Sequence, residues 1–169
     1  DYALTFLKNH NAQAKDDPFF LYVAYNAAHW PLHAKPEDIE PYKGLYSMGW
    51  DVLREQRYER MVDLGIVDPA WQLSPRHPDV PAWKEEAHKK WQERRMEVYA
   101  AQITCMDRNI SRIIDHLKAN GEYENTLFIY QQDNGGCHVE YNPDRTGSWT
   151  RPFTTCLLYT SDAADDLLC

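Results

Sequence analysis

The sequence has few cysteines, few glycines and no long hydrophobic run. Of its 169 residues, four are cysteine and seven are glycine. No apolar stretch approaches the roughly 20 residues that a membrane-spanning helix needs, so we expect no membrane span. Acidic residues outnumber basic ones: the sequence has 26 Asp and Glu but 18 Lys and Arg, which gives a net charge of −8. Phosphate contacts need clustered Lys and Arg, so this balance excludes a general nucleic-acid-binding protein.

The overall composition is typical of a globular protein, with 43% hydrophobic and 26% charged residues. The chain begins at Asp1, without Met or a signal peptide. Residues 156–169 differ in amino-acid composition from the residues before them. That tail resembles the translation of a sequencing adapter, so we interpret it as non-native. We therefore expect residues 1–155 to be a piece of a longer protein. Only Cys105 and Cys137 remain there, too few for a disulfide framework, and whether they pair stays open.

Two short apolar runs and one long amphipathic stretch predict an α/β fold. Residues 19–25 (FFLYVAY) read as a strand buried on both faces, and residues 126–130 (TLFIY) as a second strand. Between them, apolar residues recur in steps of three and four over about 83–120, which predicts a long helix ending at Gly121. A strand, a helix and a strand in this order indicate a parallel sheet. Residues of about 30–83 form a Pro-rich insertion with a helix over 51–64.

Polar residues that could carry chemistry follow both predicted strands, where parallel α/β sheets gather their functional groups. His29 follows the first strand; a lone histidine beside a tryptophan is usually a packed, hydrogen-bonded residue, but this position at a strand end favours an active-site role. Asp133 and Asn134 follow the second strand and precede Gly135 and Gly136. Asn-Gly is typical of a tight turn, but a carboxylate beside an amide oxygen also suits Ca²⁺ or Mg²⁺.

Several segments together resemble the type I sulfatases of the alkaline phosphatase superfamily, most closely bacterial arylsulfatases. The two strand ends carry the strongest match, PFFLYVAYNAAHWPLHA over residues 18–34 and NTL to DNGG over residues 125–136. Further matches lie at residues 42–44, 49–54, 73–76 and 97–101. The resemblance covers residues 1–155 and implies part of a parallel-sheet sandwich of the sulfatase type.

The resemblance also implies an activity and roles for three residues. Sulfatases hydrolyse sulfate esters with a formylglycine nucleophile and a divalent cation, most often Ca²⁺. Asp133 and Asn134 match the family's metal-ligand pair, and His29 matches the histidine that contacts the sulfate and helps the leaving group depart. Ala28 stands where the family usually has Pro, and Gln132 where it has a small polar residue. The formylglycine motif and the remaining ligands are expected upstream of Asp1 or beyond residue 155, so we expect this chain alone to be inactive.

Two other readings stay open from the sequence. A phosphodiester or phosphonate monoester hydrolase of the same superfamily would share the metal pair and the histidine. A non-catalytic, carbohydrate-binding homologue could stack sugars on the aromatic-rich insertion. The expected partner of the enzyme is a small-molecule or carbohydrate sulfate ester. Its oligomeric state, and a periplasmic, secreted or cytoplasmic location, are left open.

Overall fold

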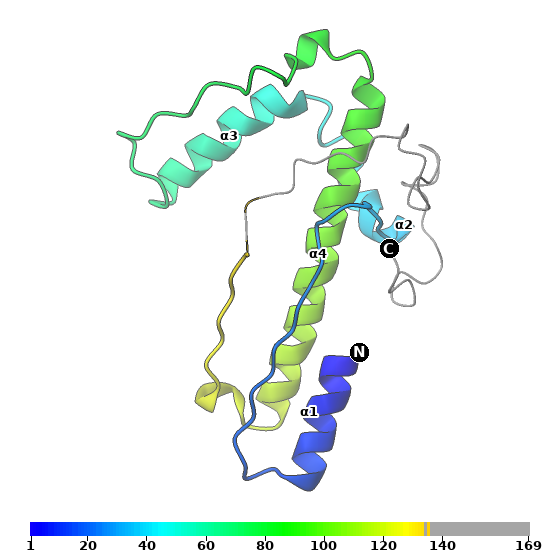
Figure 1. The fold of residues 1–169 in the computed structure, drawn as a ribbon, viewed down its shortest axis with the longest axis vertical. Helices are drawn as coiled ribbons and strands as arrows, with labels where there is room; N and C mark the ends of the chain where they lie inside the picture. The colour runs from blue at the N-terminus through cyan, green and yellow to red at the C-terminus, as the bar shows by residue number, and fades with distance from the viewer. Residues whose placement is uncertain (134, 136–169) are drawn as a thin grey trace.

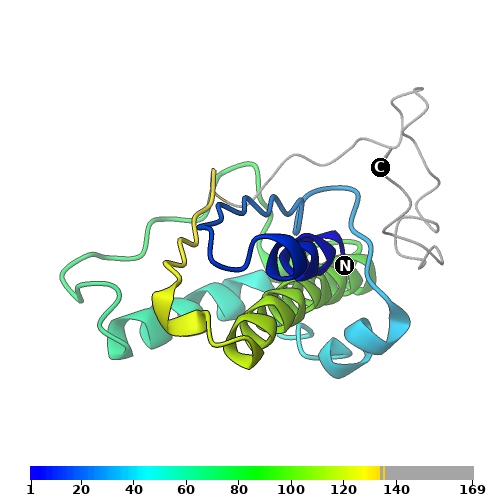
Figure 2. The same ribbon diagram turned by 90° about the horizontal axis from the view of Figure 1, so that it is seen from below.

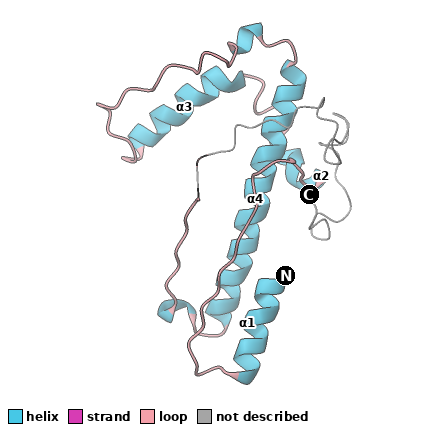
Figure 3. Ribbon diagram, viewed as in Figure 1, coloured by secondary structure: helices cyan, strands magenta, loops and turns pink. Residues whose placement is uncertain are grey.

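The computed structural model describes residues 1–133 and 135, and its regular structure is helical (Figures 1 and 3). The longest helix, α4, forms the long axis of the molecule, with α1 packed along one end of it and α3 leaning away near the other (Figure 1). The elements are α1 (Tyr2–Gln13), α2 (Pro36–Ile39), η1 (Glu40–Tyr42), α3 (Gly49–Asp63), η2 (Trp83–Glu85), α4 (Lys89–Ala119) and η3 (Tyr123–Asn125), where η marks a 3₁₀ helix. No helix in the described part of the chain is long and apolar enough to cross a membrane.

The long helix predicted from apolar periodicity is confirmed as α4. It begins at Lys89, later than the pattern suggested, because Trp83–Glu85 form the separate turn η2. It ends where Asn120 Nδ2 donates to the carbonyl of His116 at 2.7 Å and Gly121 takes a positive φ of 73°. Its buried side matches the predicted apolar face only in part, because Met106 and Leu117 are buried whereas Tyr99 and Ile103 are exposed. The other buried residues of α4 are Glu97, Val98 and Ala101.

The core lies where the first half of the chain folds back onto α4. Five buried residues form it: Leu32, Ala34, Ile39, Val98 and Ala101. Asp38 is 2% exposed, and its Oδ1 accepts from Arg108 Nη2 at 2.5 Å. Glu97, also buried, accepts from the backbone N–H of Gly44 at 2.9 Å. Charge pairing and apolar packing together hold α2 and the turns around it against α4.

The predicted parallel sheet is not confirmed, because residues 19–25 and 126–130 form no strand among the described residues. Both segments are extended, and they run in the same direction, opposite to α4 (Figure 1). In the view from below, both lie to the side of α4 (Figure 2). Strands require hydrogen bonds to a neighbouring backbone, whereas a helix satisfies its own. The described residues bring no partner strand to either segment.

The expected burial of residues 19–25 on both faces is wrong. Phe19, Leu21 and Val23 are half-buried, while Phe20 is 91% and Tyr22 74% exposed. This alternation is the period-two pattern of an extended chain with one covered face. In the second segment Leu127, Phe128, Ile129 and Tyr130 are all exposed, at 84%, 44%, 77% and 64%.

Candidate functional site

His29 lies on a tight turn directly after the extended segment of residues 19–25. Its backbone N–H donates to the carbonyl of Asn26 at 2.8 Å, and its side chain is exposed. The ring Nδ1 lies 2.7 Å from the carbonyl oxygen of Trp30. Because a carbonyl only accepts hydrogen bonds, Nδ1 carries the proton of the neutral ring. The geometry therefore leaves Nε2 as the unprotonated nitrogen of the neutral ring.

The residues after His29 anchor this turn to α4. Trp30 packs against the buried core cluster, and the guanidinium of Arg95 lies over its indole ring, 4.7 Å from the ring centroid. Gln102 Nε2 approaches the carbonyl of Pro31 at 3.5 Å, and Leu32 is buried at 3% exposure. The exposed imidazole of His29 therefore lies on a turn whose following residues are anchored to the core.

A cavity of about 230 Å³ lies between the His29 turn and α4. Gln102 lines it, and the side-chain oxygen Oε1 of Gln102 is buried without a hydrogen-bond partner in the described part of the chain. Tyr25 also lines it, and partial burial, together with the nearby Cys105, raises the pKa of that phenol. The main polar and aromatic lining residues are Tyr25, Asn26, His29, Trp30, Gln102 and Asn109.

Cys105 lines the same cavity and is half-buried. Its carbonyl accepts from Asn109 Nδ2 at 2.8 Å. Cys137, the other cysteine of residues 1–155, lies outside the described residues, so their pairing stays open.

Asp133 ends the second extended segment, and its side chain is exposed. Asn134 lies outside the described residues. A carboxylate open to solvent is the hard oxygen donor that Ca²⁺ prefers, but one carboxylate is far from the roughly 6–8 oxygens of a Ca²⁺ shell. Within the described residues no three His, Cys, Asp or Glu side chains gather at metal-binding distance. The donor type fits a divalent cation, but Asp133 alone does not make a cation site.

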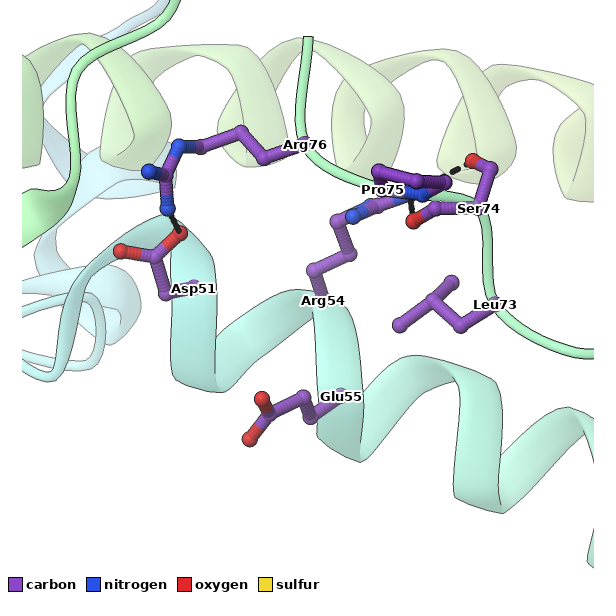
Figure 4. Close-up of a pocket in the computed structure, with 7 residues that line it drawn as sticks. All are labelled: Asp51, Arg54, Glu55, Leu73, Ser74, Pro75 and Arg76. Carbon is purple, nitrogen blue, oxygen red and sulfur yellow. Dashed lines mark hydrogen bonds and ion pairs between the residues drawn. The ribbon is translucent and has the colours of Figure 1, made fainter. Parts of the chain in front are cut away.

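A second hollow, of about 300 Å³, lies between α3 and the chain that returns along it (Figure 4). Arg54 Nη2 donates to Ser74 at its carbonyl (2.5 Å) and at Oγ (2.8 Å). Arg76 Nη1 donates to Asp51 Oδ1 at 2.9 Å. Both guanidinium groups already have hydrogen-bond partners within the protein. We therefore interpret this hollow as a structural contact between α3 and the loop that returns along it, called the return loop below.

Sequence reasoning missed Arg95 and Gln102 as supports of the His29 turn. They are seven residues apart on α4, and at 3.6 residues per turn they share one face of the helix. The spacing was a detectable signal, but nothing in it indicated which distant segment this face would meet.

The sulfatase family model matches residues 1–162, and the chain belongs to that family. It is 41% identical over 134 residues to an uncharacterised sulfatase of Schizosaccharomyces pombe, covering 76% of this chain and 23% of the relative. It is 33% identical over 148 residues to an arylsulfatase of Klebsiella aerogenes, covering 79% of this chain and 30% of the relative. Arylsulfatase J of Mus musculus is 28% identical over 119 residues, or 70% of this chain and 12% of the relative. The chain therefore spans less than a third of the length of these relatives.

Proposed function

We propose that the longer sulfatase of which this chain is part hydrolyses sulfate esters, and that this chain supplies His29 at the leaving-group side. The observation that carries the proposal is the hydrogen bond between His29 Nδ1 and the Trp30 carbonyl, which leaves Nε2 exposed at the end of the turn. Family membership and the similarity to an arylsulfatase favour aryl sulfates among the possible esters.

The hydrogen bond at His29 Nδ1 supports a proton transfer through Nε2. As the bond between sulfur and the leaving oxygen breaks, negative charge develops on that oxygen. An imidazolium at His29 can donate its Nε2 proton there and revert to the neutral ring. Through both states the Nδ1–H stays bonded to the Trp30 carbonyl, so the ring keeps one orientation while its charge changes.

Asp133 and Asn134 are proposed as two ligands of a divalent cation, most naturally Ca²⁺. Such an ion stabilises negative charge on the sulfate oxygens when bound. The exposed carboxylate of Asp133 supports this assignment by its chemistry. We expect the formylglycine nucleophile from the protein upstream of Asp1.

Residues 19–25 and 126–130 are proposed as neighbouring parallel strands of the complete domain. Their common direction along α4 and the exposed faces at Phe20, Tyr22 and Ile129 support this (Figure 1). Backbone groups and apolar side chains left open here would be covered by strands from the rest of the sulfatase.

The test is a substrate comparison on the longer protein. Aryl sulfates, phosphodiesters and phosphonate monoesters are assayed side by side with added Ca²⁺. We expect the highest kcat/KM for an aryl sulfate. A higher value for a phosphodiester or phosphonate would replace the proposal with the phosphoryl-transfer alternative. Binding of sulfated sugars without turnover of any ester would identify a non-catalytic homologue.

A further inference from the structure

Trp30 connects two residues that are distant in the sequence. Its backbone carbonyl accepts from His29 Nδ1 at 2.7 Å, and its indole ring lies beneath the guanidinium of Arg95 at 4.7 Å. Trp30 and Arg95 are both half-buried. A cation over an indole face is attracted by the ring quadrupole, and partial burial strengthens that attraction. Because the indole ring and the carbonyl belong to the same residue, a contact that restrains the Trp30 ring also restrains the carbonyl that orients His29.

We propose that Arg95 is a positioning residue for His29, acting through Trp30; this inference rests on the leaving-group role of His29 proposed above. Arg95 is itself held, because its Nη1 donates to Gln92 Oε1 at 2.8 Å on the preceding turn of α4. A planar guanidinium stacks on an aromatic ring in a way that an ammonium does not reproduce fully. Arg95 thereby links the exposed His29 turn to the long helix α4.

A second contact from the same helix face supports this assignment. Gln102, two turns further along α4, approaches the Pro31 carbonyl at 3.5 Å. The His29 turn is thus contacted by α4 at both Trp30 and Pro31. The stacked Arg95 is the stronger of the two contacts, because 3.5 Å is long for a hydrogen bond.

Loss of Arg95 has a specific expected consequence. With its ring less restrained, Trp30 can shift and turn its carbonyl away from His29 Nδ1. The neutral ring is then free to carry its proton on Nε2 or to rotate, and fewer molecules hold Nε2 towards the leaving oxygen. Arg95 touches neither substrate nor reacting atoms in this scheme.

The test uses the longer sulfatase and a series of aryl sulfates whose phenols differ in pKa. We expect Arg95→Ala to lower kcat by roughly 2- to 30-fold for the esters of the weakest phenol acids, and less for good leaving groups. Arg95→Lys should restore part of the loss, since it keeps a cation over the ring. Lys118→Ala is the matched control, because Lys118 Nζ lies over the Tyr123 ring at 4.9 Å on the same helix, away from His29. It should leave kcat unchanged.

A double-mutant comparison separates positioning from general stability. If Arg95 acts only through His29, then Arg95→Ala has no further effect on kcat in a His29→Ala background. The same loss in both backgrounds, or an equal loss for all leaving groups, would overturn the positioning role. A full-rate His29→Ala enzyme would instead refute the proposed function of His29. If Arg95→Ala does not fold, the same comparison is made with Arg95→Lys, whose smaller loss must also vanish in the His29→Ala background.

Discussion

The indole ring of Trp83 covers Gly49 so closely that a Cβ on Gly49 would lie 2.1 Å from Trp83 Cγ. Trp50 packs edge-on against the same ring at 4.7 Å and donates from Nε1 to the Pro81 carbonyl at 3.0 Å. Asp51 Oδ2 accepts from the backbone N–H of Trp83 at 2.8 Å. The start of α3 and the turn η2 therefore form one joint, which closes the Pro-rich loop between them.

Replacement of Gly49 by alanine should destabilise this joint. Gly49 has a φ of +80°, which costs an L-residue about 1–2 kcal/mol, and overpacking against Trp83 adds roughly 1–3 kcal/mol. Gly65→Ala is the control, because Gly65 has a similar φ of +68° with nothing within 4 Å of its added Cβ. Denaturant unfolding of the longer protein measures both. Equal losses of unfolding free energy would show that Trp83 yields to the new methyl group.

The stabilising effect of Asp51 should depend on pH. The backbone hydrogen bond from Trp83, and then the contact with Arg76, lower the pKa of Asp51. A lowered pKa in the folded state means that the carboxylate stabilises the fold above the unfolded value, about 4, and loses this effect as the pH falls through the folded value. Asp51→Asn should therefore lower Tm at pH 7 and have a smaller effect near pH 3. Asp63→Asn, at an exposed position on α3, serves as control. A pH-independent difference would assign the effect of Asp51 to shape alone.

His29→Ala in the longer sulfatase should lower kcat by about 10²–10⁴-fold for esters with poor leaving groups. The loss should shrink for good leaving groups, which need no proton. His77→Ala, an exposed histidine in the return loop, should behave as the parent enzyme. A steady-state series of aryl sulfates measures the dependence. A uniform loss across the series would mean that His29 only orients the sulfate group.

Metal content should fall more in Asp133→Ala than in Asn134→Ala, because the first change removes a charged ligand and the second a neutral one. Elemental analysis of the purified longer protein and both variants provides the measurement. Asp115→Ala, an exposed position on α4, is the matched carboxylate control. Unchanged metal content in Asp133→Ala would show that these residues form an ordinary turn and do not bind the metal.

Residues 1–155 expressed alone should show no hydrolysis of aryl sulfates or phosphodiesters with added Ca²⁺. They carry the proposed proton donor and part of one metal shell, but no assigned nucleophile. Exposed Phe20, Tyr22, Leu127 and Ile129 should also make the product poorly soluble. Activity assays and sedimentation of the refolded chain test both points. Turnover that disappears with His29→Ala would place a nucleophile within these residues.

Much of the local structure followed from the sequence. The period of three and four predicted α4, and Gly121, which was expected at the end of that helix, has a positive φ there. Helix α1 extends through polar residues to Gln13, and His10 within it packs edge-on against Phe19 at 5.4 Å. That extension depends on a contact outside the helix, which local pattern does not encode.

The sequence by itself determined the family, the long helix and the place of His29 after an apolar segment. These are local properties, because helical hydrogen bonds join residues four apart and a motif is read in order. Tertiary structure alone decided that Arg95 would lie on Trp30, that Trp83 would cover Gly49, and that residues 19–25 would keep one face open. Each depends on segments far apart in the chain, and a strand in particular exists only when a second backbone is present to pair with it.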